Sequence, residues 1–325
     1  MIYFENNSTN PYFNLALEEY FLKYDAEDDI LILWRNDNTV VVGRYQNTAQ
    51  EINERFCREN RVSVVRRNTG GGAVYHDLGN LNFSIITGYK QGDDISFRRF
   101  LGAISVALKK LGVDARLRGR NDLVVGDKKV SGSAQTIVAG RILHHGTLLC
   151  NSDLDMLAGA LQSDPTVYAS KAIASVRSRV ANIQDFNTDV TVDMLKGGLL
   201  SEFRRSAPLL EYKLQEVELA EVCLLQKSKY DTWRWNYGES PAFDFSKTTR
   251  FTRGSVTVSL VVEAGIIRSC AITGDFLGLM DVADVEDALT GTRLLFGDVA
   301  ACIARFDTGL YFGGISSEEV ASCFF

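Results

Sequence analysis

The chain has 325 residues, of which 46% are hydrophobic and 23% are charged, and its formal net charge is −6. These values are ordinary for a folded globular protein and exclude a long disordered tract. The acidic surplus argues against general affinity for nucleic acid or anionic membranes, because such partners demand an excess of Lys and Arg.

The termini and the cysteines point to a cytoplasmic protein. The first residues, MIYFENNSTN, contain no basic leader, and no apolar run is long enough to cross a bilayer. The cysteines lie far apart without a CxxC pair, so we expect reduced thiols and not a disulfide framework or a zinc site. A monomer is the default expectation.

The first part of the chain alternates helical and strand patterns. Residues 10–24 begin with Asn10 as a plausible N-cap and Pro11 at the first helical position, which predicts an amphipathic helix. Two β-rich runs at 30–34 and 39–44 flank Asn36-Asp37-Asn38 and together predict a hairpin. A helix over about 49–59, a strand over 62–67, a glycine cluster and a strand over 81–86 follow.

The middle of the chain is rich in strands. A helix over about 97–111 is followed by strand patterns at 122–125, 129–138 and 142–149, which are joined by short turns. Connections this short cannot make parallel crossovers, so we predict an α+β fold with a mixed, largely antiparallel sheet. Further helices are expected after Ser152, after Thr191 and around Glu218.

A second domain is expected at the C-terminal end. Around residues 237–249 the periodicity gives way to Gly, Pro, Ser and Thr, and a new hairpin pattern begins at 256–262 and 266–272. We therefore predict a domain over residues 1–245 and a small α+β domain over 246–325. A module of this size is only marginally able to support its own core, so we expect it to dock on the first domain.

The densest run of chemistry-bearing residues is RRNTGGGAVYHD, at 66–77. Consecutive glycines permit positive φ and let successive N–H groups converge on an anion, and the two arginines add donors suited to carboxylate or phosphate. An isolated run of three glycines is explained equally well by a flexible turn. The neighbouring arginines and histidine favour an anion site.

A second cluster surrounds Lys129. On a strand, Lys129, Ser131 and Ser133 share one face and could line a pocket, where the lysine would offset charge growing on a phosphate and carboxylate. The alternative is a surface hairpin with an ordinary Gly-Asp-Lys-Lys turn. Asp122 could hold Mg²⁺ against phosphate oxygens, or cap a turn.

Several catalytic classes lack the residues they need. His144 and His145 are adjacent on a predicted strand, so they point to opposite faces and cannot share a metal. The chain has only three histidines and no GxSxG or HExxH motif, which leaves few residues for a hydrolase site. The nucleotide-binding motifs GxxxxGK[ST] and GxGxxG are also absent from the sequence.

Cys150 is the one thiol near the clusters, and a thioester mechanism would use it, although a cysteine at a strand end is more often a buried apolar residue.

Six ordered stretches resemble the motifs of the lipoate-protein ligases. They are RRNTGGGAVYHDLGNLNF, GRNDLVV, DKKVSGSAQ, HHGTLL, KAIASVRSRVANI and WRWNYGESPAF, and the resemblance runs from about Asn14 to Phe243. The C-terminal module resembles the accessory domain of that family in order and length. The resemblance implies a catalytic domain shared with biotin ligases, in which lipoate and MgATP give lipoyl-adenylate and a lysine of an acceptor protein then attacks it.

The resemblance also implies roles for individual residues. Lys129 would contact the acyl carbonyl and the phosphate, and Asn121 and Asp122 would lie at the phosphate and Mg²⁺. The remaining expected contacts with substrate or adenylate are Arg67, Gly70, Gly71, Gly72, Val74, His76, Asn80, Ser133, Ala134, His145 and Gly146. An apolar tunnel for the acyl tail would include Val74 and the strand at 81–85.

The acceptor and the acyl group stay open at this stage. Candidate acceptors are the lipoyl domain of a 2-oxoacid dehydrogenase E2 subunit and the glycine cleavage H protein, and one apolar tunnel could hold lipoate or octanoate. An ATP-independent octanoyl or lipoyl transferase that uses Cys150 is the main alternative. A non-catalytic sensor or repressor is the third, against which stand the acidic charge and the lack of an added helix-turn-helix segment.

Overall fold

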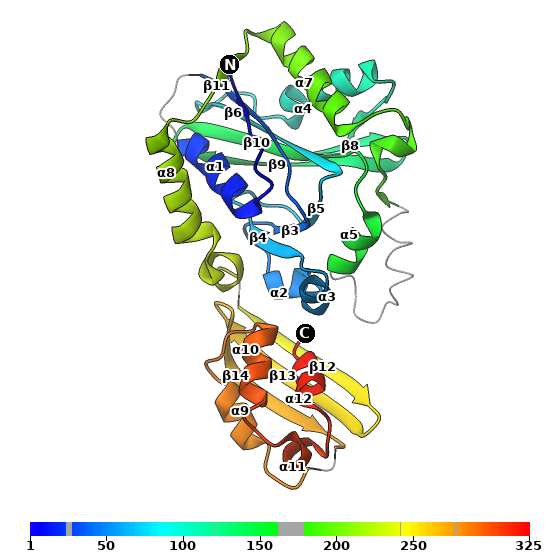
Figure 1. Cartoon of the computed structure of the whole chain (residues 1–325), viewed down its shortest axis with the longest axis vertical. Coiled ribbons are helices and arrows are strands. Elements are labelled where there is room, and N and C mark those ends of the chain that lie inside the picture. The colour runs from blue at the N-terminus through cyan, green and yellow to red at the C-terminus, as the bar shows by residue number, and fades with distance from the viewer. Residues whose placement is uncertain (24–27, 120, 162–178, 241, 277) are drawn as a thin grey trace. The chain divides into compact units, whose positions relative to one another are not determined.

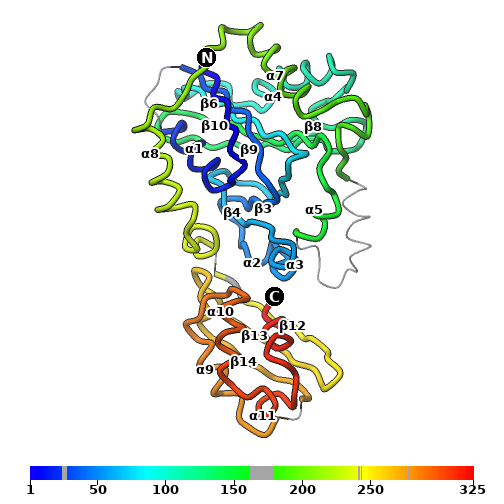
Figure 2. The backbone as a smooth tube through the Cα atoms, viewed as in Figure 1, coloured from blue at the N-terminus to red at the C-terminus, as the bar shows by residue number. Residues whose placement is uncertain are grey.

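The computed structural model describes residues 1–23, 28–119, 121–161, 179–240, 242–276 and 278–325, and the path of the chain is traced in Figures 1 and 2. The chain forms two compact units. Unit 1 comprises Met1–Arg44 and Val62–Thr232, and unit 2 comprises Tyr45–Arg61 and Trp233–Phe325. The expected boundary at residue 246 falls inside a strand of unit 2, and the assignment of catalytic and accessory roles to 1–245 and 246–325 stays a prediction.

Unit 1 is built on an eight-stranded sheet of mixed direction. Its order is β11 (Leu210–Tyr212), β1 (Ile2–Glu5), β2 (Ile30–Trp34), β6 (Asn80–Gly88), β10 (Arg141–Leu149), β9 (Lys128–Val138), β8 (Asp122–Val125) and β7 (Arg116–Arg118). The pairs β11–β1 and β1–β2 are parallel and the others are antiparallel. The predicted α+β fold with a largely antiparallel sheet is confirmed.

The hairpin predicted for residues 30–44 is wrong. β2 pairs with β1 and β6, whereas β3 (Thr39–Val42) belongs to a separate sheet, between β4 (Ser63–Arg66) and β5 (Val74–His76). Every residue of β2 and β3 is buried, so each strand needs a partner on both edges. Local turn chemistry could not show that these partners come from distant segments.

Helices cover the two faces of the large sheet. On one face, α4 (Phe97–Lys110) and α7 (Val192–Ser206) form the main core with Leu81, Phe83 and Ile85 of β6. On the other face, α1 (Pro11–Lys23) packs on β2, β6 and β10, beside α8 (Glu216–Leu225). Because strand residues alternate, the polar residues Asn82 and Ser84 face the α1 side. Among the described residues, the remaining helices of unit 1 are α5 (Leu154–Ala160), η1 (Ile183–Asp185) and the π-helical turn η2 (Gln226–Tyr230).

Unit 2 has its own sheet and core. Its antiparallel strands are β12 (Phe243–Phe251), β13 (Gly254–Glu263) and β14 (Ile266–Gly274), and alternate residues of β13 are buried under helices. These helices are α9 (Ala283–Leu289), α10 (Phe296–Ile303), α11 (Thr308–Phe312) and α12 (Ser317–Ser322). The apolar alternation of β13 explains why so small a segment forms a continuous core.

Residues 45–61 belong to unit 2, although they precede most of unit 1 in sequence. They form α2 (Thr48–Glu51) and α3 (Glu54–Glu59), where one helix was predicted, because Asn53 caps α3 by accepting from the N–H of Phe56. Thr48 Oγ1 donates to the carbonyl of Asn236, in the π-helical turn η3 (Arg234–Gly238), at 2.6 Å. Such contacts hold this early segment in the C-terminal unit.

Candidate active site

A pocket lies on the α1 side of the large sheet, entirely within unit 1. Its empty volume, which includes open solvent at the mouth, is about 660 Å³. The lining comes from α1, the two sheets and the glycine-rich loop between β4 and β5. The lining residues are Leu15, Trp34, Val41, Arg67, Gly71, Gly72, Ala73, Val74, His76, Asn82, Asn121, Lys129, Gly132, Ser133, Ala134, His145, Gly146 and Thr147.

Most of the predicted site residues meet at this pocket. Those that line it are Arg67, Gly71, Gly72, Val74, His76, Asn121, Lys129, Ser133, Ala134, His145 and Gly146. Gly70, Asn80 and Asp122 are not part of the lining, but each bonds to a residue that is. The roles of these residues toward a ligand stay predictions.

Arg67 ties the glycine-rich loop to the strands. Its side chain is only 6% exposed, and burial lowers its pKa to about 10, although Glu18 acts in the opposite direction. Nη2 donates to the carbonyls of Gly70 (2.7 Å) and Gly72 (2.8 Å), and Nη1 donates to the carbonyl of Val41 (3.1 Å). The sequence predicted an anion-binding guanidinium, but in this structure most of its donors hold backbone carbonyls.

Arg66 and Gly72 of this segment differ from the expectation, whereas Gly71 agrees with it. Arg66 is fully buried, and its Nη1 donates to the carbonyls of Gly43 and Arg44, so it stabilises the backbone and does not line the pocket. Gly71 has a φ of +92°, which only glycine adopts without strain. Gly72 has no positive φ, and a side-chain Cβ there would meet no atom within 4 Å.

Lys129 is the cation at one end of the pocket. Its Nζ lies 2.8 Å from Oδ1 of Asp122, and both side chains are partly exposed. The carbonyl of Lys129 accepts from the N–H of Ala181 (3.0 Å), which fixes the backbone there. A Cβ on Gly132 would come within 2.8 Å of Lys129 Cε and Nζ. Glycine at 132 therefore makes room for the ammonium, a requirement that the sequence did not reveal.

Strand alternation near Lys129 holds only in part. Lys129 and Ser133 line the pocket as predicted, but Ser131 does not, since it is fully buried and its hydroxyl has no partner among the described residues. The register of β8 and β9 shifts between Leu123 and Val124, which disturbs the simple alternation. Asn121 bonds to the backbone of Ser133, with Nδ2 to the carbonyl at 2.6 Å.

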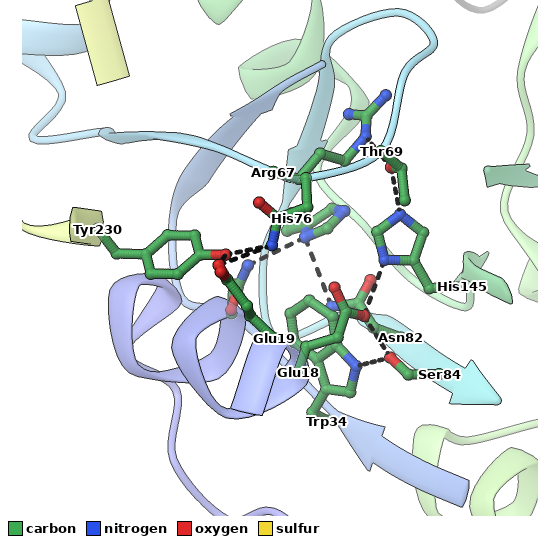
Figure 3. A network of polar contacts seen from close by, with 12 residues as sticks. Glu18, Glu19, Trp34, Arg67, Thr69, His76, Asn82, Ser84, His145 and Tyr230 are labelled. Atoms are coloured by element: carbon green, nitrogen blue, oxygen red, sulfur yellow. Dashed lines mark hydrogen bonds and ion pairs between the residues drawn. The ribbon is translucent and has the colours of Figure 1, made fainter. Parts of the chain in front are cut away.

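A buried polar network connects the arginine to helix α1 (Figure 3). Arg67 Nε donates to Thr69 Oγ1 (2.9 Å), and Thr69 Oγ1 lies 2.7 Å from His145 Nε2. His145 Nδ1 lies 2.8 Å from Oε1 of Glu18, which is 1% exposed. Because an arginine can only donate, Thr69 keeps its own proton for His145 Nε2.

The same network continues through Ser84 to Trp34, which lines the pocket. Ser84 Oγ donates to Glu18 Oε1 (2.6 Å), and Trp34 Nε1 donates to Ser84 Oγ (2.8 Å). Sequence reasoning missed Glu18, although its position between Leu15 and Leu22 at helical spacing places a carboxylate on the apolar face of α1. A charged residue on such a face needs buried partners, and this signal could have found it.

A second polar cluster centres on Glu19, which sequence reasoning also missed. Glu19 Oε2 accepts from Lys229 Nζ (2.6 Å), the Tyr230 hydroxyl (2.6 Å) and Asn68 Nδ2 (2.9 Å), and Oε1 accepts from Lys23 Nζ (2.6 Å). Burial by itself would raise the pKa of Glu19, but these donors lower it to about 2. The ionised carboxylate joins α1, η2 and the residue after Arg67.

The two adjacent histidines lie on opposite faces of β10, as predicted. His145 lines the pocket, whereas His144 stacks between Phe83 and Phe100, with ring centroids at 5.9 and 4.7 Å. Burial lowers the pKa of His144 to about 3, and the charge of His145 acts in the same direction. His144 is therefore a neutral core residue.

Cys150 also belongs to the core. It is fully buried in the cluster under α4 and α7, its Sγ donates to the carbonyl of Val190, and burial raises its pKa to about 11. Leu81, Phe83 and Ile85, expected to line a tunnel, face the same core, and from this part of β6 only Asn82 reaches the pocket. The tunnel prediction was wrong for these residues because the strand turns its apolar side away from the site.

Three of the six sequence stretches are not described in full or do not belong to unit 1. Arg120 of GRNDLVV, residues 171–178 of KAIASVRSRVANI and Pro241 of WRWNYGESPAF fall outside the described residues, and WRWNYGESPAF belongs to unit 2. Among the described residues, every helix is too short or too polar to cross a bilayer.

Two family models match the chain. The lipoyl protein ligase A/B catalytic domain matches residues 10–204, and the bacterial lipoate protein ligase C-terminus matches residues 240–324. Among curated proteins, lipoate–protein ligase 1 of Staphylococcus aureus is 42% identical over 317 residues, which is 97% of each chain.

Solved structures of lipoate-protein ligases also match the chain. A bi-partite lipoate protein ligase from Thermoplasma acidophilum, described together with its E2 lipoyl domain, superposes with a TM-score of 0.67 and is 34% identical, covering 73% of this chain and 96% of that one. A lipoate-protein ligase A bound with ATP has a TM-score of 0.64 and 33% identity, covering 73% of this chain and 98% of that one.

Proposed function

Because the chain belongs to the lipoate-protein ligase family, we propose that it converts lipoate and MgATP into lipoyl-adenylate and pyrophosphate and then transfers the lipoyl group to a lysine of an acceptor protein. The observation that carries this proposal is one pocket that is lined both by Lys129 and by the apolar residues Leu15, Trp34 and Val41. Such a site suits an acid with a charged head and an apolar tail.

In the first step, a carboxylate oxygen of lipoate attacks the α-phosphorus of ATP, and the bond to pyrophosphate breaks. Negative charge grows around that phosphorus, and the Lys129 ammonium stabilises it as a fixed cation. An arriving phosphate competes with Asp122 for the ammonium, which frees the carboxylate. One carboxylate together with substrate phosphates is a usual environment for Mg²⁺, so Asp122 suits the metal of MgATP.

Arg67 acts in this proposal by shaping the loop that the adenylate meets. Its bonds to the carbonyls of Gly70 and Gly72 fix the path of the glycine-rich loop. A preorganised loop stabilises charge without reorganising during the reaction.

In the second step, the ε-amine of an acceptor lysine attacks the mixed anhydride and AMP leaves. The relative from T. acidophilum is described with an E2 lipoyl domain, which supports a lipoyl domain as the acceptor here, and the glycine cleavage H protein is a second acceptor of the same chemistry. We assign residues 1–245 to catalysis and residues 246–325 to an accessory domain.

The test is exchange of radiolabelled pyrophosphate into ATP, with and without lipoate and with and without a lipoyl domain. We expect lipoate-dependent exchange that collapses in Lys129→Ala. Lys128→Ala is the matched control, because Lys128 is the neighbouring lysine of β9 and does not line the pocket. Folded wild-type protein that shows no exchange under any of these conditions would refute the proposal.

Cys150→Ser separates this ligase from a cysteine-dependent transferase. A ligase keeps full exchange and full lipoyl transfer in this variant, since Cys150 lies in the core. If transfer from an acyl carrier, without ATP, occurred in the wild type and was lost in Cys150→Ser, the transferase would replace the ligase.

A further inference from the structure

We propose that His76 donates a hydrogen bond from Nε2 to the sulfur-bearing end of the acyl substrate and thereby favours lipoate over octanoate. This inference rests on the proposed function, because it takes the acyl group to lie in the pocket with its carboxyl end at Lys129. It is carried by the polar contacts around the imidazole, which fix where its proton resides.

The orientation of the Asn14 amide is fixed by backbone carbonyls. Asn14 Nδ2 contacts the carbonyl oxygens of Ser8 (3.1 Å) and Arg35 (2.9 Å), which can only accept. The same nitrogen donates to Asn36 Oδ1 at 2.9 Å. The oxygen of the Asn36 amide therefore faces Asn14, and its nitrogen faces the other way.

The nitrogen of that second amide faces the histidine. Asn36 Nδ2 lies 3.1 Å from His76 Nδ1, so this ring nitrogen must accept and cannot carry the proton. Asn82 Nδ2 lies 3.4 Å from the same ring nitrogen, which agrees with Nδ1 as the acceptor. The proton of His76 therefore resides on Nε2.

Among the described residues, the Nε2–H group has no hydrogen-bond partner. His76 is 3% exposed and lines the pocket, and its Nε2 is buried without a hydrogen bond to any described residue. Burial lowers the pKa of His76 to about 3, and the nearby Arg67 and His145 act in the same direction, so the ring stays neutral. An unpaired buried donor at the wall of a pocket is a group that a ligand would satisfy.

The position of the ring indicates which part of the ligand it meets. His76 lies against Asn82 of β6 and Trp34 of β2, with 6.2 Å between the rings of His76 and Trp34 (Figure 3). Lys129 lies on β9, which β10 separates from β6. With strands about 4.8 Å apart, the backbones of β6 and β9 are roughly 10 Å from each other. The imidazole, which lies against β6, is therefore on the side of the pocket away from the strand that carries Lys129.

In lipoate, the only acceptors remote from the carboxyl group are the two sulfurs of the dithiolane ring, which are weak acceptors. Octanoate offers only hydrogens on carbon and would bury the Nε2–H group unpaired. A site that contains a buried donor discriminates against the analogue that lacks the acceptor.

The first experiment compares kcat/KM for lipoate and octanoate in pyrophosphate exchange. His76→Phe keeps a flat ring without the donor, and we expect it to lower the lipoate-to-octanoate ratio about 3- to 10-fold, the usual range for one neutral hydrogen bond. His144→Phe is the matched control, since it replaces a buried histidine of unit 1 outside the pocket, and it should leave the ratio unchanged. An equal loss for both acids in His76→Phe would overturn the proposal and leave His76 with a structural role.

The second experiment measures the proton position directly and needs no turnover. With only three histidines in the chain, ¹H–¹⁵N correlation spectra of histidine-labelled protein resolve each tautomer. We expect the Nε2–H form for His76, with a shift of this proton on addition of lipoate and none with octanoate. Asn36→Asp keeps the acceptor for Asn14 but turns its other oxygen to the ring, so the proton should move to Nδ1.

A wild-type His76 with its proton on Nδ1 would overturn the proposal even if every variant failed to fold. Folded protein that shows the Nε2–H tautomer and a lipoate-specific shift, but no exchange with either acid, would instead refute the proposed ligase activity and leave the binding inference standing.

Discussion

We expect unit 1 to lose unfolding free energy at acid pH because His144 is buried, and the size of this loss can be estimated. Its folded pKa is about 3, because burial between aromatic rings disfavours the charged form, whereas an unfolded histidine titrates near 6.5. The stability from keeping this ring neutral is fully present above pH 6.5. It is lost as the pH falls from 6.5 toward 3, because the unfolded chain takes up a proton that the folded chain does not.

The loss at pH 5 is about 2 kcal/mol for this ring, since 1.36 kcal/mol per pH unit applies over about 1.5 units. His76, whose pKa is also about 3, adds a similar amount. We therefore expect the wild-type free energy of unfolding to fall by about 4 kcal/mol between pH 7 and pH 5 from these two groups.

The variant His144→Phe isolates the contribution of His144. It loses the contact of Gln135 Nε2 with His144 Nδ1 (3.0 Å), but it also removes Nε2, which is buried without a partner among the described residues. A phenyl ring fits between Phe83 and Phe100, so we expect a change under about 1 kcal/mol at pH 7. At pH 5 the variant should have lost about 2 kcal/mol less than the wild type.

The assay is urea unfolding followed by circular dichroism at several pH values between 5 and 8. The slope of the unfolding free energy against pH reports the protons taken up on unfolding, and it should be smaller in the variant by close to one proton in the acid range. If both proteins lost the same free energy between pH 7 and pH 5, His144 would titrate normally in the folded state and the argument from burial would be refuted.

Three further predictions concern the site and its supports. Gly71→Ala should lower thermal stability by about 1–2 kcal/mol because of its φ of +92°, while Gly72→Ala should change it by under about 0.5 kcal/mol; equal effects would contradict the loop geometry. Gly132→Ala should displace the Lys129 ammonium and reduce pyrophosphate exchange at least 10-fold with little loss of stability, and undiminished exchange would show that the lysine position is not critical. Glu19→Gln should destabilise the protein by about 2–3 kcal/mol in chemical denaturation, because the ionised carboxylate accepts from several buried donors. The exposed control Glu221→Gln should have almost no effect. A loss in Glu19→Gln no greater than in the control would mean that the Glu19 cluster contributes no net stability.

Much of the site could be predicted because its residues are adjacent in sequence and obey a local rule. The two-residue period of a strand placed His144 and His145 on opposite faces, and the structure confirms this. Lys129 and Ser133 were placed on one wall by the same rule. The rule failed at Ser131, and Gly132 and Ala134 also line the pocket although the rule places them on the other face. The short turns between strands also sufficed to predict the mixed, largely antiparallel sheet.

Contacts between distant segments could not be predicted in this way. The partners of Glu18 could be named only once β6 and β10 were known to lie under α1, and the contacts of Asn36 with Asn14 and His76 likewise depend on the tertiary structure. Arg67 was predicted to bind an anion, which stays a prediction, and only the tertiary structure shows that its guanidinium also donates to the backbone carbonyls of the glycine-rich loop.

The pairing of strands and the division into units show the same limit most clearly. Residues 30–44 contain two strands and a good turn, yet the strands belong to different sheets, and residues 45–61 belong with the C-terminal unit. Dihedral preferences and side-chain alternation depend on a few neighbouring residues, so they can be predicted from the local sequence. The pairing of buried strand edges and helix faces depends on how the whole chain buries its apolar surface, so only the tertiary structure determines it.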